Sequence, residues 1–372
     1  MLGSPESASN ESVPARSTMS SAAFEWPLAR GDRQGTAFVP SGSLPEQLVR
    51  RWTFRADDAI ETAAVVRDGR VFVGSLDGNL YALRLGDGKL LWKFATELGF
   101  TAPAAVDAEH VYAGDADGVF YCLSVTEGRE VWRLTTDAEI NSAANLLGEN
   151  VVVGSQDGKL YCRDRMTGNE VWTHESPDQI RCFPSTSQGR LFVAGCDGRL
   201  HVIDATSGGQ VSEVEMDGPT GCTPAVDGRV AYVGTEQGRF FAIDWMGSRV
   251  VWRHESADRP AAIRSSAAVT EQLVVFGTRG RVVQALTRAT GKEHWQFAAR
   301  AKVDSSPVVV GNRVFVGTGD GVLLELTLDK GEAIWEYECG GAITASPAVA
   351  GGRLVIGTDR GELFCFGAEG EQ

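Results

Sequence analysis

The chain has 372 residues, 43% of them apolar, with 44 glycines and a formal net charge of −14. This acidic balance argues against nucleic-acid binding and against a surface drawn to anionic lipid, because both need clustered Lys and Arg. The apolar fraction is ample for a buried core, and no stretch is long and apolar enough to predict a membrane-spanning helix.

The N-terminal residues 1–23 are rich in Ser, Ala and Pro and contain no apolar run. That composition predicts a disordered segment and lacks the apolar centre of a signal peptide. We therefore expect the chain as written to be cytoplasmic, or periplasmic if an N-terminal signal or anchor has been lost. Direct insertion into a membrane is not expected.

Residues 24–48 read FEWPLARGDRQGTAFVPSGSLPEQL and show no regular alternation, although aromatic residues and prolines are frequent. We expect an ordered, irregular segment that packs on the main domain and is held there by Phe24 and Trp26. Residues 49–54, VRRWTF, then have the composition of a strand, yet they precede every complete repeat of the chain.

A repeated unit follows this strand and accounts for most of the chain. Its clearest copy is Gly74–Trp92, GSLDGNLYALRLGDGKLLW, and closely similar stretches end at Trp132 and Trp172. Each copy has short alternating segments separated by glycine turns, which is typical of antiparallel strands joined by hairpins. Tryptophans recur every 40 residues from Trp52 to Trp172, and Ser212 stands where the next one is expected. Self-similarity at this period indicates a repeat architecture.

The glycine turn after the second strand occurs eight times. This predicts an all-β, eight-bladed β-propeller of four-stranded antiparallel blades over residues 49–367. The first strand of a unit is expected over segments such as Ile140–Leu147. The eighth unit, Ile343–Gly367, lacks a tryptophan strand. We therefore expect Val49–Phe54 to be the outer strand of the last blade, because this closure leaves no open sheet edge. Residues 368–372 form a C-terminal tail.

Several turn-to-tryptophan segments, among them CRDRMTGNEVW and ALTRATGKEHW, resemble the docking motif AxDxxTGxxxW of the pyrroloquinoline-quinone (PQQ) type propeller repeat. The resemblance extends over about residues 49–367. A tryptophan in this motif can lie flat between adjacent blades and bury a large ring each time. The predicted structural docking residues are Trp52, Trp92, Trp132, Trp172, Trp252, Trp295 and Trp335.

The PQQ-repeat family has catalytic and non-catalytic members. Its quinoprotein dehydrogenases need a vicinal cysteine pair, clustered calcium ligands and a catalytic aspartate, whereas this chain has no Cys-Cys pair. The chain resembles the non-catalytic group, which contains the outer-membrane assembly scaffold BamB. This resemblance implies a monomeric, non-enzymatic scaffold without a cofactor, which binds a protein or peptide partner. A PQQ-dependent oxidoreductase and a ligand-sensing module of a signalling system remain as alternatives.

No arrangement of cysteines or histidines predicts a metal site or a catalytic site. The seven cysteines are expected to be small buried residues. A bridge between Cys182 and Cys222 nevertheless stays open, because they share one position on neighbouring repeats. His174 and His254 also share a repeat position, on outer strands that are too far apart to hold one metal ion.

One column of the aligned first strands carries polar side chains, just after the leading apolar residue of each strand. First strands line the channel of a propeller, so this column predicts a polar ring around one mouth of the channel. We interpret the ring as a partner-binding mouth in which two arginines contact anionic groups. The alternative is a solvated channel whose charges only neutralise one another. The candidate residues are Glu61, Asn141, Arg181, Arg264 and Asp304.

Overall fold

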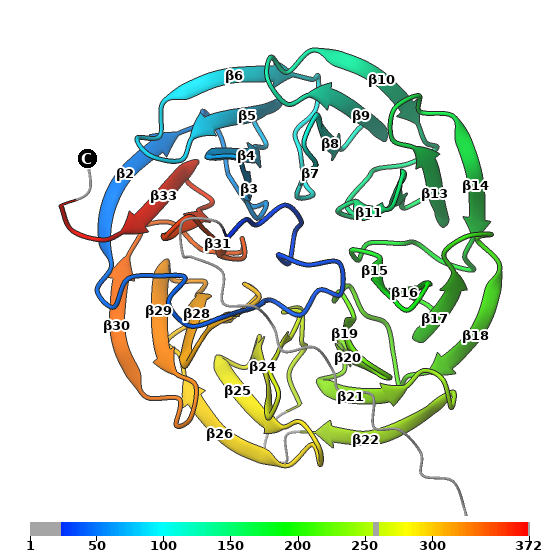
Figure 1. The fold of residues 1–372 in the computed structure, drawn as a ribbon. Coiled ribbons are helices and arrows are strands. Elements are labelled where there is room, and N and C mark those ends of the chain that lie inside the picture. The colour runs from blue at the N-terminus through cyan, green and yellow to red at the C-terminus, as the bar shows by residue number, and fades with distance from the viewer. Residues whose placement is uncertain (1–23, 256–259, 371–372) are drawn as a thin grey trace, which may run out of the picture.

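The computed structural model describes residues 24–255 and 260–370. All regular elements in these two stretches are β-strands, which form eight blades around a central channel (Figure 1). The predicted all-β, eight-bladed propeller is thereby confirmed. The expected disordered segment 1–23 lies outside the described residues, as do residues 371–372 of the predicted tail.

Blades 1 to 4 are four-stranded antiparallel sheets whose strands follow one another in chain order. The strands of blade 1 are β3 (Val65–Arg67), β4 (Arg70–Gly74), β5 (Asn79–Arg84) and β6 (Leu90–Ala95). Those of blade 2 are β7 (Ala105–Val106), β8 (His110–Gly114), β9 (Val119–Ser124) and β10 (Glu130–Thr135). Those of blade 3 are β11 (Asn145–Leu147), β12 (Asn150–Gly154), β13 (Lys159–Asp164) and β14 (Glu170–Glu175). Those of blade 4 are β15 (Ser185–Ser187), β16 (Arg190–Ala194), β17 (Arg199–Asp204) and β18 (Gln210–Glu215).

Blades 5 to 7 repeat this arrangement. The strands of blade 5 are β19 (Ala225–Asp227), β20 (Val230–Gly234), β21 (Arg239–Asp244) and β22 (Arg249–Glu255). Those of blade 6 are β23 (Ala268–Val269), β24 (Leu273–Thr278), β25 (Val282–Thr287) and β26 (Glu293–Ala298). Those of blade 7 are β27 (Val308–Val310), β28 (Arg313–Gly317), β29 (Val322–Thr327) and β30 (Ala333–Glu338).

Blade 8 is built from both ends of the chain. It contains β31 (Ala348–Ala350), β32 (Arg353–Gly357) and β33 (Glu362–Gly367), and its outer strand is β2 (Val49–Arg55). β2 pairs antiparallel with β33 and places Trp52 opposite Cys365. The predicted closure of the ring by the N-terminal strand is confirmed. Closure in this way removes an unpaired sheet edge that either terminus would otherwise leave exposed.

The innermost strands are shorter than the sequence predicts. Of the expected first strand Ile140–Leu147, only the part in β11 is a strand. Residues 140–144 turn toward the adjacent blade instead, and the amide of Ile140 donates to the carbonyl of Asp115 in blade 2 at 3.2 Å. Equivalent amide bonds recur at all eight junctions. Contacts between blades therefore replace the sheet ladder at the start of each first strand.

A bulge in each outer strand turns its central side chain toward the neighbouring blade. In blade 3, Val171 stays 43% exposed while Trp172 next to it is only 7% exposed. The indole Nε1 of Trp172 donates to the carbonyl of Ala205 in blade 4 at 3.2 Å. Its ring lies against Gly208, where a Cβ would come within 2.6 Å of the ring. A bulge reorients a side chain in this way because two residues face one on the partner strand.

Six of the eight junctions have this contact, with indole-to-carbonyl distances of 2.7–3.2 Å. The donor and acceptor pairs are Trp52 and Leu85, Trp92 and Val125, Trp132 and Arg165, Trp172 and Ala205, Trp252 and Arg288, and Trp295 and Leu328. In the seventh blade the ring of Trp335 packs on Phe366 of blade 8, with centroids 5.5 Å apart. The junction between blades 4 and 5 has Ser212 at this position.

Candidate functional site

The irregular segment 24–48 runs once around the inside of the propeller and closes one end of its channel (Figure 1). Over residues 24–37, its backbone accepts hydrogen bonds from the first strands, or the turns after them, in all eight blades. These bonds satisfy backbone groups that the inner sheet edges leave free. They join Phe24 to Gly351 (blade 8), Trp26 to Val66 (blade 1), Pro27 to Val106 (blade 2), Arg33 to the side chain of Asn145 (blade 3) and to Thr186 (blade 4), Gln34 to Val226 (blade 5), Thr36 to Val269 (blade 6) and Ala37 to Val309 (blade 7).

Two further features hold this segment in place. The strand β1 (Phe38–Val39) pairs parallel with β27, which adds a fifth strand to the sheet of blade 7. Trp26 is 1% exposed and packs on Gly31, where a Cβ would lie 2.6 Å from the indole ring. Gly31 has a φ of +83°, so the turn and the close ring contact both require glycine there.

Arg30 projects from the segment into the channel. Its side chain borders the channel cavity, and the residue is only 4% exposed. Nη2 donates to the carbonyls of Pro307 at 2.9 Å and Ala267 at 3.1 Å, in blades 7 and 6. Nε and Nη1 are buried and have no hydrogen-bond partner in the described part of the chain. Burial lowers the pKa of the guanidinium to about 10, so it stays charged at neutral pH.

The cavity above Arg30 has a volume of about 140 Å³, and a layer of eight residues, one from each blade, borders it. Four of these residues are apolar and four carry hydroxyl groups, and the hydroxyl-bearing residues come from the consecutive blades 5 to 8. The layer consists of Ala63, Pro103, Ala143, Phe183, Thr223, Ser266, Ser306 and Ser346. This layer of the channel wall is therefore polar on the side of blades 5 to 8 only.

The five predicted mouth residues lie at the open end, and the structure brings three of them together. Glu61, Asn141 and Arg181 border the channel cavity. Arg264 and Asp304 do not border it, because each forms ion pairs with neighbouring charged side chains. Arg264 pairs with Glu236 at 2.9 Å, and Asp304 pairs with Lys302 at 3.0 Å and Arg279 at 3.3 Å.

Two of the polar residues that border the cavity, Arg181 and Asn141, have hydrogen-bond partners at the mouth. Arg181 donates to the side-chain carbonyls of Gln179 at 2.6 Å and Gln156 at 3.2 Å. Asn141 accepts a hydrogen bond from the hydroxyl of Thr101 at 2.5 Å. These contacts hold the side chains in a defined ring, although Arg181 and Glu61 remain exposed to solvent.

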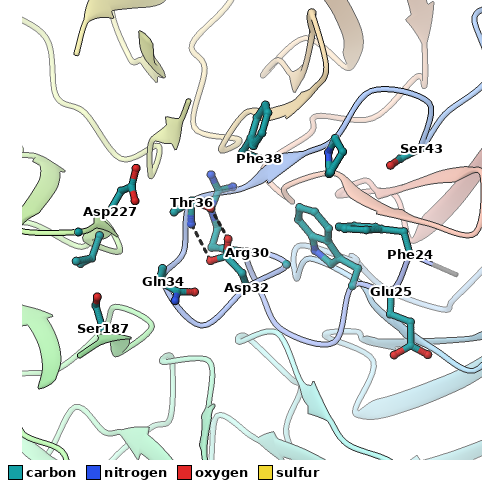
Figure 2. A pocket seen from close by; sticks show the side chains of 15 residues that line it. Phe24, Glu25, Arg30, Asp32, Gln34, Thr36, Phe38, Ser43, Ser187 and Asp227 are labelled. Atoms are coloured by element: carbon teal, nitrogen blue, oxygen red, sulfur yellow. Dashed lines mark hydrogen bonds between the residues drawn. The ribbon is translucent and has the colours of Figure 1, made fainter. Parts of the chain in front are cut away.

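A larger pocket lies at the closed end, between the segment and the turns of blades 4 and 5 (Figure 2). Its volume is about 550 Å³, and Phe24, Trp26 and Phe38 contribute aromatic side chains to its lining. Sequence reasoning missed this pocket because one of its walls is the segment 24–48, which does not follow the repeat. The aromatic residues of the aperiodic segment were its only signal in the sequence.

The acidic groups of this pocket differ in their partners. Asp227 forms an ion pair with Arg288 at 2.7 Å, and Glu25 with Arg67 at 3.6 Å. Asp32 instead accepts hydrogen bonds from the amide of Thr36, at 3.0 Å, and from its hydroxyl (Figure 2). Burial raises the pKa of the Asp32 carboxyl above its ordinary value, although these hydrogen bonds oppose the shift.

The cysteines and histidines form no site in the described residues. All seven cysteines are free, so Cys182 and Cys222 are not bridged. The Sγ of Cys222 donates to the carbonyl of Ile263 at 3.0 Å. Within residues 24–255 and 260–370 no group of three or more His, Cys, Asp or Glu residues is placed to hold a metal ion. The same residues contain no helix that is long and apolar enough to cross a membrane.

The fold and the channel define the class of protein: an eight-bladed propeller that is closed at one end by its own N-terminal segment and open at the other. The family model described as Outer membrane protein assembly factor BamB matches residues 49–181, 164–285 and 249–372. The chain belongs to this family. A search of curated proteins gave no match.

Three solved structures show how widely the fold is shared. BamB from Moraxella catarrhalis is 20% identical, with a TM-score of 0.75 over 88% of this chain and 99% of that one. The quinohemoprotein alcohol dehydrogenase from Comamonas testosteroni is 14% identical, with a TM-score of 0.82 over 94% and 81%. A europium-containing methanol dehydrogenase is 13% identical, with a TM-score of 0.78 over 93% and 98%. Likeness at these identities shows the fold alone and does not separate scaffold from enzyme.

Proposed function

We propose that this protein is a non-enzymatic binding propeller that docks a protein or peptide partner on the open mouth of its channel. The observation that carries the proposal is the asymmetry of the channel. The segment fills one end, and a cavity of only about 140 Å³ remains below the mouth. Small-molecule sites typically enclose about 300–1,000 Å³. The polar mouth therefore suits contact with a partner's surface better than enclosure of a large cofactor.

The residues around the channel do not fit a bound PQQ. That cofactor is a planar molecule of fused rings, and the family's dehydrogenases hold it with a vicinal cysteine pair and calcium ligands. This chain has no Cys-Cys pair, and the channel layer consists of small side chains and Phe183. Among the described residues no cluster of carboxylates is placed to hold a metal ion. We therefore assign no catalytic step to this channel.

Family membership supports a partner in outer-membrane assembly, the role that the name of the matching family states. The polar groups at the mouth follow residues whose backbone amides bond to the adjacent blade, such as Ile140, and binding surfaces are often built on such fixed supports. Arg181 and Arg264 offer two exposed cations on an otherwise acidic protein. Charges in this arrangement favour an anionic partner surface and contribute mainly to specificity and association rate.

The test is an Arg181→Glu, Arg264→Glu double variant, assayed by affinity capture from an extract of the native organism. We expect the variant to keep its melting temperature, because both side chains are solvent-exposed. It should capture at least tenfold less of the partner that the unmodified protein retains, because two cations of the proposed interface become anions.

The matched control is Arg84→Glu, Arg129→Glu on the outer rim, where both arginines are exposed and each pairs with a nearby acid. This control should retain the partner. Loss of the partner in the rim variant together with full retention in the mouth variant would show that the partner docks on the blade edges.

The pocket at the closed end favours a second candidate, a ligand-sensing module. Its volume of about 550 Å³ lies in the range of small-molecule sites, and it combines aromatic walls with the carboxylate of Asp32. A thermal-shift screen of amine-bearing aromatic metabolites, repeated with Phe38→Ala, tests this candidate. A ligand that raises the melting temperature of the unmodified protein but not of the variant would support sensing over scaffolding.

A further inference from the structure

The hydroxyl groups on one side of the channel share an unusual bonding pattern. Each accepts a hydrogen bond from a backbone amide of the preceding blade, at 2.9–3.2 Å. None of them donates to a protein group in the described part of the chain, so four O–H groups remain available toward the cavity. The amide and hydroxyl pairs are Phe183 and Thr223, Thr223 and Ser266, Ser266 and Ser306, and Ser306 and Ser346.

Two more donors at this cavity lack partners. The Oγ1 atom of Thr344 is buried without a hydrogen bond, and Thr344 borders the cavity beside Ser346. Arg30 borders it from the closed end, and its buried Nε and Nη1 atoms have no hydrogen-bond partner among the described residues. No carboxylate of the described residues forms an ion pair with Arg30, although the charge of Asp32 acts to raise the pKa of the guanidinium. A buried cation that forms no direct ion pair is costly, and a buried hydroxyl without a partner adds to the cost.

We propose that this channel cavity is a binding site for a small oxyanion, a carboxylate or a phosphate, held by Arg30 and the hydroxyl groups of Thr344, Ser266, Ser306 and Ser346. A guanidinium presents a planar set of N–H donors that matches a pair of oxyanion oxygens. Hydroxyl donors on the opposite side of the anion complete its coordination. The cavity meets the proposed partner surface at Glu61, Asn141 and Arg181, but none of the proposed anion donors is among these three residues.

Charge and size both favour an oxyanion over other occupants. A metal cation would meet the positive charge of Arg30, and an apolar molecule would leave the hydroxyl protons unsatisfied. A volume of about 140 Å³ accommodates acetate or phosphate and excludes a large cofactor. Glu61 borders the same cavity at its mouth end, but it is exposed to solvent, so its repulsion is screened.

The competing explanation gives Arg30 only a structural role, because Nη2 already ties the segment to the carbonyls of blades 6 and 7. That role does not involve the hydroxyl of Thr344, which has no hydrogen-bond partner within residues 24–255 and 260–370. Thr344→Val therefore separates the two explanations. It removes a donor of the proposed site while it breaks no hydrogen bond and preserves the shape of the side chain.

The experiment is isothermal titration of the full chain at neutral pH and constant ionic strength, with sodium acetate and with sodium phosphate. Tri-alanine with a free carboxylate and its C-terminal amide are titrated in parallel. The variants are Thr344→Val, Arg30→Lys and Arg30→Met. The matched control is Thr53→Val on the outer strand β2, where the side chain is exposed and lies outside the cavity lining.

We expect saturable binding of at least one oxyanion, weakened about tenfold by Thr344→Val, since a hydrogen bond to a charged group is lost. Arg30→Lys should weaken it further, Arg30→Met should abolish it, and Thr53→Val should leave it unchanged. Preference for acetate or phosphate over tri-alanine indicates a free anion, whereas preference for tri-alanine over its amide indicates a peptide terminus.

Three results would overturn the proposal. The first is the absence of saturable binding of every oxyanion by the unmodified protein. The second is an affinity of Thr344→Val equal to that of Thr53→Val. The third is retained binding by a folded Arg30→Met protein. If Arg30→Met does not fold, Thr344→Val and Arg30→Lys decide the matter, because the first breaks no hydrogen bond of the protein and the second keeps the charge.

Discussion

Two adjacent blade junctions have different residues at the position where one blade packs on the next. Between blades 3 and 4, Trp172 lies over Gly208 and donates to the carbonyl of Ala205. Between blades 4 and 5 the equivalent of the tryptophan is Ser212, and the position beneath the absent ring is Ser248. Ser248 keeps a left-handed φ of +47°. The turn alone thus tolerates a side chain, and it is the ring above that excludes one at the regular junctions.

The junction between blades 4 and 5, called the irregular junction below, has an aromatic residue that comes from blade 5 and not from blade 4. Trp245 of blade 5 stands at the position whose carbonyl accepts the indole elsewhere. Its ring packs on Phe192 of blade 4, with centroids 5.2 Å apart, and its Nε1 donates to Gly228 of its own blade at 3.0 Å. An open cavity of about 460 Å³ remains beside Ser212. This junction is therefore packed less closely at the rim than its neighbours.

The difference continues toward the channel. At the regular junction, Gly154 lies against Ile180, where a Cβ would come within 2.3 Å of the isoleucine side chain. The equivalent positions between blades 4 and 5 are Ala194 and Thr220, and the hydroxyl of Thr220 donates to the carbonyl of Gly234 at 2.6 Å. Residues in contact across a junction thus change as a set, because a larger side chain on one blade requires a smaller one on the next.

The largest loss of stability is expected when the strand that closes the ring is removed, because both junctions depend on a closed propeller. A protein lacking residues 1–55 loses β2, exposes β33 as an edge and loses the contact of Trp52 with blade 1. It also loses the segment that bonds to all eight blades. We expect it to aggregate or to melt well below the full chain, as measured by circular dichroism and light scattering.

The control for ring closure is a protein lacking only residues 1–23, whose composition predicts disorder. Its melting temperature should equal that of the full chain. Equal melting temperatures for the two truncated proteins would contradict the role assigned to β2 and the segment.

A smaller effect is expected from Trp172→Ala at the regular junction. Truncation of this buried ring should lower the free energy of unfolding by about 3–5 kcal/mol, the range for a large aromatic core residue. Urea denaturation followed by circular dichroism measures the change. The half-buried Trp132→Ala provides a comparison within the same motif. A loss below about 1 kcal/mol at both sites would show that the rings contribute little to blade docking.

The smallest effect is expected when the regular motif is installed at the irregular junction. Ser212→Trp alone should destabilise the protein by about 1–3 kcal/mol, because the new ring meets the side chain of Ser248 and the ring of Trp245. Adding Ser248→Gly should recover most of this loss. A double-mutant cycle by urea denaturation gives the coupling free energy between the two substitutions. Additive effects would show that the tryptophan ring does not need a glycine beneath it.

The architecture was predictable because the signal is local and repeated. Glycine turns and alternating segments such as Leu80–Leu83 specify hairpins from neighbouring residues, and eight copies specify the number of blades. Closure by Val49–Phe54 followed from counting strands. The polar mouth could also be located, because it occupies one position of the repeat. The expected extent of the first strands was wrong, because bonds between blades compete there with the sheet ladder.

The sequence by itself determined the propeller, its closure and the position of Trp172 and its equivalents within the repeat, because short-range patterns carry that information. Only the tertiary structure showed that Arg30 and Thr344 border the same channel cavity. These residues are more than 300 positions apart in the chain. The segment that carries Arg30 has no period, and its path is decided by backbone bonds to all eight blades at once. Contacts of that kind depend on the closed ring, which no local pattern in residues 24–48 describes.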